Sequence, residues 1–329
     1  MAPFVFALSW VVSRIGRLVT VTNLILMVAT GLSAIAASSG QAVRYQSTTM
    51  VDLVIVAHED DWQLFMGDVL AKRANSTSRI VIVYLTAGDV GRDSAYWRTR
   101  ERAAMASAAQ VVPVVLTTVP ASCDTATANG HGITRCVLPN FTEWFLRLPD
   151  GRRNGSGYRT HGFQSLRKLH DRRLSGIDAI DGSTRYTGWA DLVATVRTIA
   201  ESEPASTISI HANDPSVLIN PHDHYDHRMA GRLAADLQRS KQWNAYYYLG
   251  YAVAAREDNL PPDAMQTKTR LFQAYDKIMI ATNRKWSALG EHRTFYSECL
   301  RRTYRRKSAP SSRRSKETAP RHSPTQDMR

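Results

Sequence analysis

Short apolar runs alternate with helix-like segments through most of this chain, and this alternation limits the fold more than any other feature. The predicted strands are residues 51–56, 79–85, 112–119, 207–211 and 245–249, and the predicted helices are residues 62–75, 95–110, 189–201, 228–239 and 263–280. Such alternation is typical of a mainly parallel sheet with helices on both faces. We therefore expect a single catalytic α/β domain with a Rossmann-like sheet, in which residues 141–148 add a strand or hairpin arm.

The first of these strands ends in a cluster of side chains that bind metals in other proteins, Ala57-His58-Glu59-Asp60-Asp61. In open α/β sheets, binding sites lie at the carboxyl ends of the strands. One interpretation is that His58 and Asp61 bind a metal while Asp60 stays free as an acid or base. The alternative is an acidic loop in which Asp60 or Asp61 caps the following helix. The pentapeptide alone does not decide between them.

A second cluster, Asn220-Pro221-His222-Asp223-His224-Tyr225-Asp226-His227, follows the strand predicted at residues 207–211 and holds three of the ten histidines of the chain. A catalytic zinc site usually takes three protein ligands and leaves one position for water. One His and one Asp from the first cluster, with one His from the second, would complete such a set. The second cluster therefore favours a metal site over a polar loop whose histidines are caps or surface groups.

Both clusters resemble motifs of one family, the PIG-L or LmbE-like N-acetylglucosaminyl de-N-acetylases. The first is similar to the family's His-Pro-Asp-Asp signature, and residues 224–227 are similar to its His-x-x-His element. Residues 85–91 resemble the Thr-x-Gly-acidic-x-Gly loop between them. Two further segments, residues 96–101 and 268–275, look like helices of the family. The resemblance extends over residues 50–290 in the family's order, so the ordered set is more specific than any one motif.

This resemblance implies an enzyme, a zinc-dependent hydrolase that releases acetate and a free amine from an N-acetylglucosamine-type sugar or glycoconjugate. By the same resemblance His58, Asp61 and His227 would hold the metal, and a His₂Asp set also accepts iron or cobalt. Asp60 would act as general base, and His224 would donate a hydrogen bond to the oxyanion. The alternatives are a metal-dependent hydrolase of another amide or ester, and a carbohydrate-binding member of the fold that has lost turnover.

Some positions near the predicted site leave alternatives open. Glu59 stands where the family usually has Pro, and Trp62 stands where a third acidic residue is usual. Trp62 offers a flat surface on which a sugar ring stacks, and core packing is the alternative. His222 is a rival for either histidine role, with a solvent-facing position as the alternative. Asp226 is expected to orient a histidine or to cap the next helix.

Three further residues are candidates for substrate contacts. Arg92, Asp93 and Trp97 follow the second predicted strand, on the same edge of the sheet as the metal. The interpretation is that Arg92 or Asp93 bonds to sugar hydroxyls and that Trp97 stacks on the ring. The alternative is an ordinary polar loop that leads into a helix.

The first 37 residues have the order of an export signal. Arg14 and Arg17 precede residues 18–37, which carry no charge, and small residues follow at positions 34–40. This order predicts a cleaved signal peptide and a secreted or extracytoplasmic protein. A membrane anchor is the alternative, because about twenty apolar residues span a bilayer.

Cysteine positions agree with export. In an oxidising compartment Cys123 and Cys136 are predicted to form a disulfide around residues 124–135, with two free thiols as the alternative. Cys299 would then be left over.

Charge is concentrated in the carboxyl-terminal residues. The chain carries +13, of which residues 301–329 carry +8 and residues 1–37 carry +2, leaving +3 for the domain at residues 38–300. A domain so close to neutral is not expected to bind nucleic acid. Residues 301–329 are predicted to form a disordered basic tail. The tail and the N-terminal segment are candidates for contact with a membrane or an anionic envelope polymer.

Overall fold

The computed structural model of the protein describes residues 50–74, 76, 78–111, 122–282 and 293–309. In these ranges no helix combines the length and apolar character needed to cross a membrane. The strand predicted at residues 112–119 and the signal segment at residues 1–37 lie outside the described residues, as do residues 310–329 of the predicted tail.

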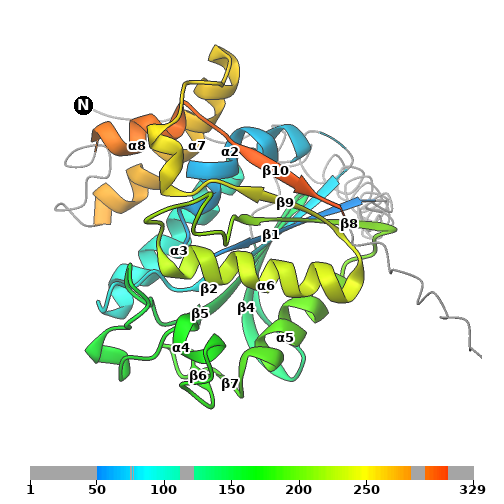
Figure 1. The fold of residues 1–329 in the computed structure, drawn as a ribbon, viewed down its shortest axis with the longest axis vertical. Helices are drawn as coiled ribbons and strands as arrows, with labels where there is room; N and C mark the ends of the chain where they lie inside the picture. Colours follow the sequence, from blue (N-terminus) through cyan, green and yellow to red (C-terminus); the bar gives the residue numbers. More distant parts are fainter. Residues whose placement is uncertain (1–49, 75, 77, 112–121, 283–292, 310–329) are drawn as a thin grey trace, which may run out of the picture. The chain divides into compact units, whose positions relative to one another are not determined.

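An eight-stranded sheet forms the centre of the described domain, in the order β10-β9-β8-β1-β2-β5-β4-β3 (Figure 1). Its strands are β1 (Met50–Val56), β2 (Ser78–Thr86), β3 (Ser122–Ala128), β4 (His131–Leu138), β5 (Phe141–Leu148), β8 (Thr207–Asn213), β9 (Asn244–Tyr248) and β10 (Arg305–Ser308). The five strands from β9 to β5 run parallel, and β10, β4 and β3 are antiparallel to their neighbours. The predicted mainly parallel α/β sheet is confirmed.

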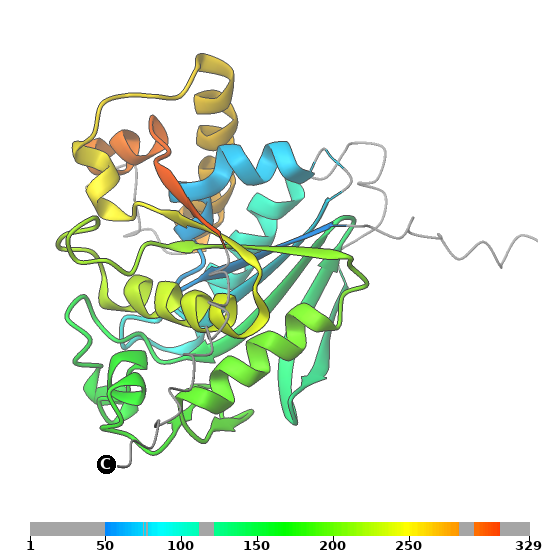
Figure 2. The same ribbon diagram turned by 45° about the vertical axis from the view of Figure 1, so that its right-hand side comes forward.

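Helices cover both faces of this sheet (Figures 1 and 2). One face packs against α2 (Asp61–Ala74), α3 (Ser94–Ala109), α7 (Pro262–Thr282) and α8 (Arg293–Leu300). The other packs against α4 (Leu166–His170), α5 (Trp189–Glu201) and α6 (Tyr225–Lys241). Short elements complete the described part: η2 (Arg159–His161), η3 (Tyr251–Ala255) and the small ribbon of β6 (Ile177–Asp178) and β7 (Arg185–Tyr186).

The central strand β1 is buried from Val51 to Val56 because it is covered on both faces. Val54 and Val56 join the core beneath α2, while Leu53 and Ile55 join the core beneath α6. From β1 the chain moves to β2 on one side and later returns to β8 on the other. The strand order therefore reverses between β1 and β8, and the crevice at such a point is where α/β sheets bind ligands. Both predicted clusters follow these two strands.

Residues beyond the predicted domain boundary also belong to the sheet. The sequence places the start of a disordered tail at residue 301, whereas Arg305–Ser308 form β10 and pair with β9. The buried ammonium of Lys268 donates hydrogen bonds to the carbonyls of Cys299 and Arg302 and to the Thr303 hydroxyl, which holds the chain before β10. The folded part thus extends through the described residues to 309.

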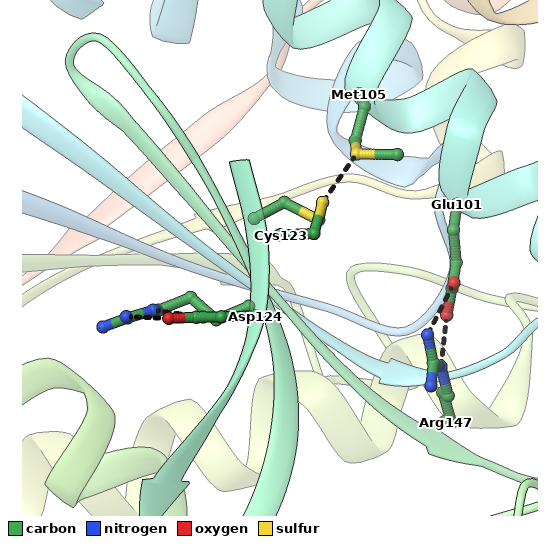
Figure 3. Close-up of a disulfide and its surroundings, with 7 residues drawn as sticks. Glu101, Met105, Cys123, Asp124 and Arg147 are labelled. Atoms are coloured by element: carbon green, nitrogen blue, oxygen red, sulfur yellow. Dashed lines mark hydrogen bonds and ion pairs between the residues drawn. A yellow bond between two sulfur atoms is a disulfide. The ribbon is translucent and has the colours of Figure 1, made fainter. Parts of the chain in front are cut away.

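The predicted disulfide joins the two outermost strands on the opposite edge of the sheet. Cys123 of β3 lies directly opposite Cys136 of β4, and their sulfurs are bonded (Figure 3). The Sγ of Cys123 also lies 3.7 Å from Sδ of Met105 on α3. Cys299 is a buried free thiol.

Candidate metal centre

Asp61 fixes the loop that follows β1. Its Oδ2 accepts hydrogen bonds from the backbone N–H groups of Ala57 at 3.0 Å and His58 at 2.9 Å. These bonds explain why an acidic residue stands at the first position of α2, where a negative charge also suits the helix dipole. They leave Oδ1 of Asp61 directed towards the histidines. The bonds to Oδ2 come from the loop before α2 and not from the first turn of the helix, so Asp61 fixes the loop rather than caps α2. The same carboxylate presents Oδ1 as a candidate ligand atom.

His58, Asp61 and His227 bring three ligand atoms together. Nε2 of His227 lies 3.0 Å from Oδ1 of Asp61 and 3.2 Å from Nδ1 of His58, and the third side of this triangle is 3.6 Å. All three side chains are buried. A tetrahedral zinc ion with ligand bonds of about 2.0–2.2 Å separates its ligand atoms by about 3.3–3.6 Å. The three residues therefore fit such an ion, and they are the set that the sequence resemblance implies.

Asp223 orients His227. Its Oδ1 lies 2.9 Å from Nδ1 of His227, so that nitrogen carries a hydrogen and Nε2 is the nitrogen that would take a metal. Burial lowers the pKa of His227, but the carboxylates of Asp61 and Asp223 outweigh it and raise the pKa to about 10. A metal that binds here must therefore displace a proton.

The loop after β1 also holds a buried guanidinium. Arg100 of α3 donates from Nη2 to Oδ1 of Asp60 at 2.6 Å and from Nε to Oε2 of Glu59 at 2.8 Å. Burial raises the pKa of Glu59 to about 7, although Arg100 opposes this shift. Glu59, at the position where the family motif has Pro, is thus the second carboxylate bonded to Arg100, whose guanidinium also holds Asp60.

His224 lies directly before α6 and caps it. Its Nδ1 accepts a hydrogen bond from the N–H of Asp226 at 3.2 Å, which places the ring hydrogen on Nε2. Burial, together with the neighbouring His58 and His227, lowers the pKa of His224 to about 3. The ring is therefore neutral, and it lies 4.7 Å from the ring of His58, centroid to centroid.

Two further carboxylates lie against these histidines. Nε2 of His58 is 3.7 Å from Oδ2 of Asp150 and 3.7 Å from Oδ2 of Asp226, and Nε2 of His224 is 3.9 Å from Oδ1 of Asp150. Sequence reasoning did not assign a role to Asp150 or Arg100. The position of Asp150 just after β5 carries a weak signal, since β5 ends at the same edge of the sheet as β1 and β8.

The structure does not bring the predicted aromatic contacts to the metal centre. Trp62 is fully buried in the core, and its Nε1 donates to the Tyr84 hydroxyl at 2.9 Å. Trp97 is 3% exposed and lies between the guanidinium groups of Arg98 and Arg147, 5.0 and 4.9 Å from them. For Trp62 the alternative of core packing is therefore confirmed. The prediction that Trp97 stacks on a sugar is wrong for this structure, because the ring is buried between two guanidinium groups.

Arg92 and Asp93 lie at the surface, and His222 is also exposed. Asp93 caps α3 by accepting from the N–H of Tyr96, and the Arg92 guanidinium lies 4.5 Å from the Tyr96 ring. Arg92 and Asp93 line a cavity of about 350 Å³ whose walls include none of the histidines. The His222 backbone is left-handed, with φ of 57°, and its carbonyl accepts from Arg153. His222 belongs to neither group of clustered ligands in the described part of the chain.

Comparison with known proteins gives one family match. The model of the PIG-L family, described as GlcNAc-PI de-N-acetylase, matches residues 53–237. No curated protein sequence matches significantly.

Several solved structures resemble the fold at low identity. The zinc-inhibited form of teicoplanin deacetylase Orf2 is 14% identical with a TM-score of 0.42, covering 76% of this chain and 90% of that one. A40926 pseudoaglycone deacetylase Dbv21 is 11% identical with a TM-score of 0.44, covering 80% and 97%. N,N′-diacetylchitobiose deacetylase from Pyrococcus horikoshii is 15% identical with a TM-score of 0.41, covering 83% and 88%.

Proposed function

The chain belongs to the PIG-L family, and on this premise we propose that it is a zinc-dependent deacetylase acting on an N-acetylglucosamine-type sugar or glycoconjugate. The observation that carries the proposal is the triangle of His58, Asp61 and His227, with the His224 ring beside that of His58. Asp60 directly precedes Asp61 in the same loop and is held there by Arg100. This arrangement offers three metal ligands, a carboxylate base and a neutral N–H donor, which amide hydrolysis at a metal requires.

The three ligands define what the metal would contribute. His58, Asp61 and His227 would hold the ion, and zinc at such a site lowers the pKa of a water and polarises the acetyl carbonyl. Asp223 supports this role because it fixes the orientation of the His227 ring.

Asp60 is the proposed base. Arg100 bonds to Oδ1 of Asp60, and no described donor bonds to Oδ2, which is therefore free to accept the proton of the attacking water. The same carboxyl then returns that proton to the nitrogen of the departing amine. The bond from Arg100 holds the carboxylate in place for both transfers.

His224 is the proposed donor to the oxyanion. Because its Nδ1 accepts from the backbone of α6, its Nε2–H is the free donor of the ring. A fixed, neutral donor stabilises the negative charge that develops on the acetyl oxygen in the transition state.

We propose from residues 1–37 that the protein is exported, with a retained membrane anchor as the alternative. The Cys123–Cys136 disulfide supports an oxidising compartment. Cell fractionation, combined with amino-terminal sequencing of the mature protein, tests this proposal. A chain that keeps residue 1 in the cytoplasmic fraction would contradict it.

The activity is tested with purified protein that is stripped of metal and reloaded with zinc. A panel of N-acetylglucosamine conjugates is offered, and free amine and acetate are measured together. We expect equal release of both, at least about a hundredfold slower in Asp60→Asn. Absence of release while sugar binding persists would instead indicate a carbohydrate-binding protein, and release from esters alone would indicate another hydrolase.

Metal content separates the histidine roles. His227→Ala is expected to lose zinc, whereas His222→Ala should keep it, because His222 is exposed and outside the ligand group. Retention of full zinc content by His227→Ala would contradict the ligand assignment.

A further inference from the structure

A second group of buried side chains lies beside the predicted zinc ligands. His58, Asp150, His224 and Asp226 each offer a ligand atom within 4.8 Å of the others. His58 belongs to both groups: its Nδ1 faces Asp61 and His227, and its Nε2 faces Asp150 and Asp226. We propose that this second group binds a second divalent cation, with His58 bridging the two ions as an imidazolate whose remaining ring proton is released to solvent.

One polar atom without a partner points to this site. Nε2 of His58 makes no hydrogen bond within the described part of the chain, although His58 is only 5% exposed. A buried polar atom left without a bond costs about 1–3 kcal/mol. Nε2 of His58 lies 3.7 Å from each of the two carboxylates, which is too long for a hydrogen bond. Ligand atoms around one ion with bonds of about 2.1 Å lie about 3–4 Å apart.

The charge of the centre supports a second ion. Its buried carboxylates are Asp60, Asp61, Asp150, Asp223 and Asp226, and Arg100, the cation beside them, is already shared with Glu59. Asp150 and Asp226 each accept a backbone hydrogen bond, from the N–H groups of Arg152 and Gly151. Burying two carboxylates side by side is still costly, and a second cation between them offsets part of that cost.

A second ion has a consequence that rests on the proposed function. It would occupy His224, the residue proposed to donate to the oxyanion. The same metal that activates the enzyme at one equivalent is then expected to inhibit it in excess, by at least about tenfold.

Ion stoichiometry tests the site without reference to activity. Metal-stripped full-length protein is titrated with zinc by calorimetry, and bound zinc is counted after equilibrium dialysis. We expect two ions of separable affinity in the unaltered protein and one in Asp150→Asn. His224→Asn is also expected to bind one ion, since asparagine still caps α6 but lacks the imidazole. Asp178→Asn, at a carboxylate bonded to Gln164 and Arg185, is the matched control and should bind two.

Circular dichroism and thermal melting establish that each variant is folded before its ions are counted. One ion in the unaltered protein, or two in both Asp150→Asn and His224→Asn, would overturn the proposal. Asp150 and Asp226 would then serve only to orient His58.

The activity readout separates failure of this proposal from failure of the proposed function. Each protein is compared with its own rate at one equivalent of zinc. Excess zinc should slow the unaltered enzyme at least about tenfold and Asp150→Asn less than about twofold. If no conjugate is hydrolysed, the proposed function fails while the stoichiometry still decides the second site.

Discussion

Arg100 donates from Nε to Oε2 of Glu59 at 2.8 Å, and both side chains are buried. The next residue of the loop, Asp60, bonds to the same guanidinium. Glu59, which departs from the family motif, thus helps to hold Arg100, and Arg100 positions the proposed base Asp60. A proline at this position would leave Arg100 with Asp60 as its carboxylate partner in the loop.

Removing the Glu59 side chain is expected to affect stability and catalysis together. Glu59→Ala leaves Arg100 short of a buried partner, so the free energy of unfolding should fall by about 3 kcal/mol. The kcat should fall more than KM rises, because the orientation of Asp60 relaxes. Glu59→Gln keeps an acceptor for Nε and should retain most of both properties. Chemical denaturation and steady-state kinetics measure these effects, and an unchanged kcat in a folded Glu59→Ala would contradict the positioning role.

Asp223→Asn should weaken the binding of the first zinc ion about 10–100-fold. The amide accepts the His227 hydrogen less well, so the ring loses its fixed tautomer. Competition with a chelator measures the affinity. Asp191→Asn is the matched control, because Asp191 bonds to His131 at 3.1 Å in a comparable Asp–His pair outside the ligand groups. Equal affinities in the two variants would show that Asp223 does not act on the metal.

Trp62→Phe should lower stability and leave substrate binding unchanged. The variant keeps an aromatic ring beside Phe141 but loses the hydrogen bond to Tyr84, at a cost of about 1 kcal/mol. Thermal melting and KM are the measurements. A KM that rises about tenfold without a lower melting temperature would mean that the ring contacts the sugar after all.

Glu143→Gln should change how stability depends on pH. Burial raises the pKa of Glu143 from 4.5 to about 8, against the opposing hydrogen bond from the Tyr84 hydroxyl. A carboxyl whose pKa is higher in the folded than in the unfolded protein makes its full contribution to folding stability below pH 4.5, and this contribution is lost as the pH rises to about 8. The slope in this window is at most about 1.4 kcal/mol per pH unit.

The Glu143→Gln variant lacks this titration. Between pH 5 and pH 8 its free energy of unfolding should therefore rise relative to that of the unaltered protein, at roughly that slope. Urea denaturation of both proteins at several pH values gives the difference, in which the other titrating groups cancel. If the difference in free energy of unfolding stayed constant from pH 5 to pH 8, Glu143 would not titrate in this range, and the prediction would be wrong.

The sequence pattern was sufficient to predict the central strands and the residues that follow them. Apart from Asp52, β1 is a run of large apolar residues that must be buried on both faces, and the position of the strand end then fixes where His58 and Asp61 lie. The three ligands that the family resemblance implies lie together in the structure.

Other features depend on tertiary contacts that no local pattern carries. Arg100 meets Asp60 from a helix 40 positions later in the chain, and Asp150 approaches His58 from the end of β5. The orientation of Trp62 was open because a residue in the first turn of a helix faces either the ligand side or the core. Packing against Phe141 and Tyr84 decides it. β10 was missed since Arg-Arg-Lys-Ser has no apolar alternation, and its strand is set by backbone pairing with β9.

That pairing has a practical consequence for any shortened form of the protein. A chain cut at residue 300, where composition suggests that the domain ends, would lack β10 and the carbonyl of Arg302 that Lys268 binds. The backbone of β9 would then present an open row of amide and carbonyl groups along the tyrosines at positions 246–248. Such an edge is a template for pairing between molecules, so the shortened protein should self-associate although its proposed metal ligands are all present.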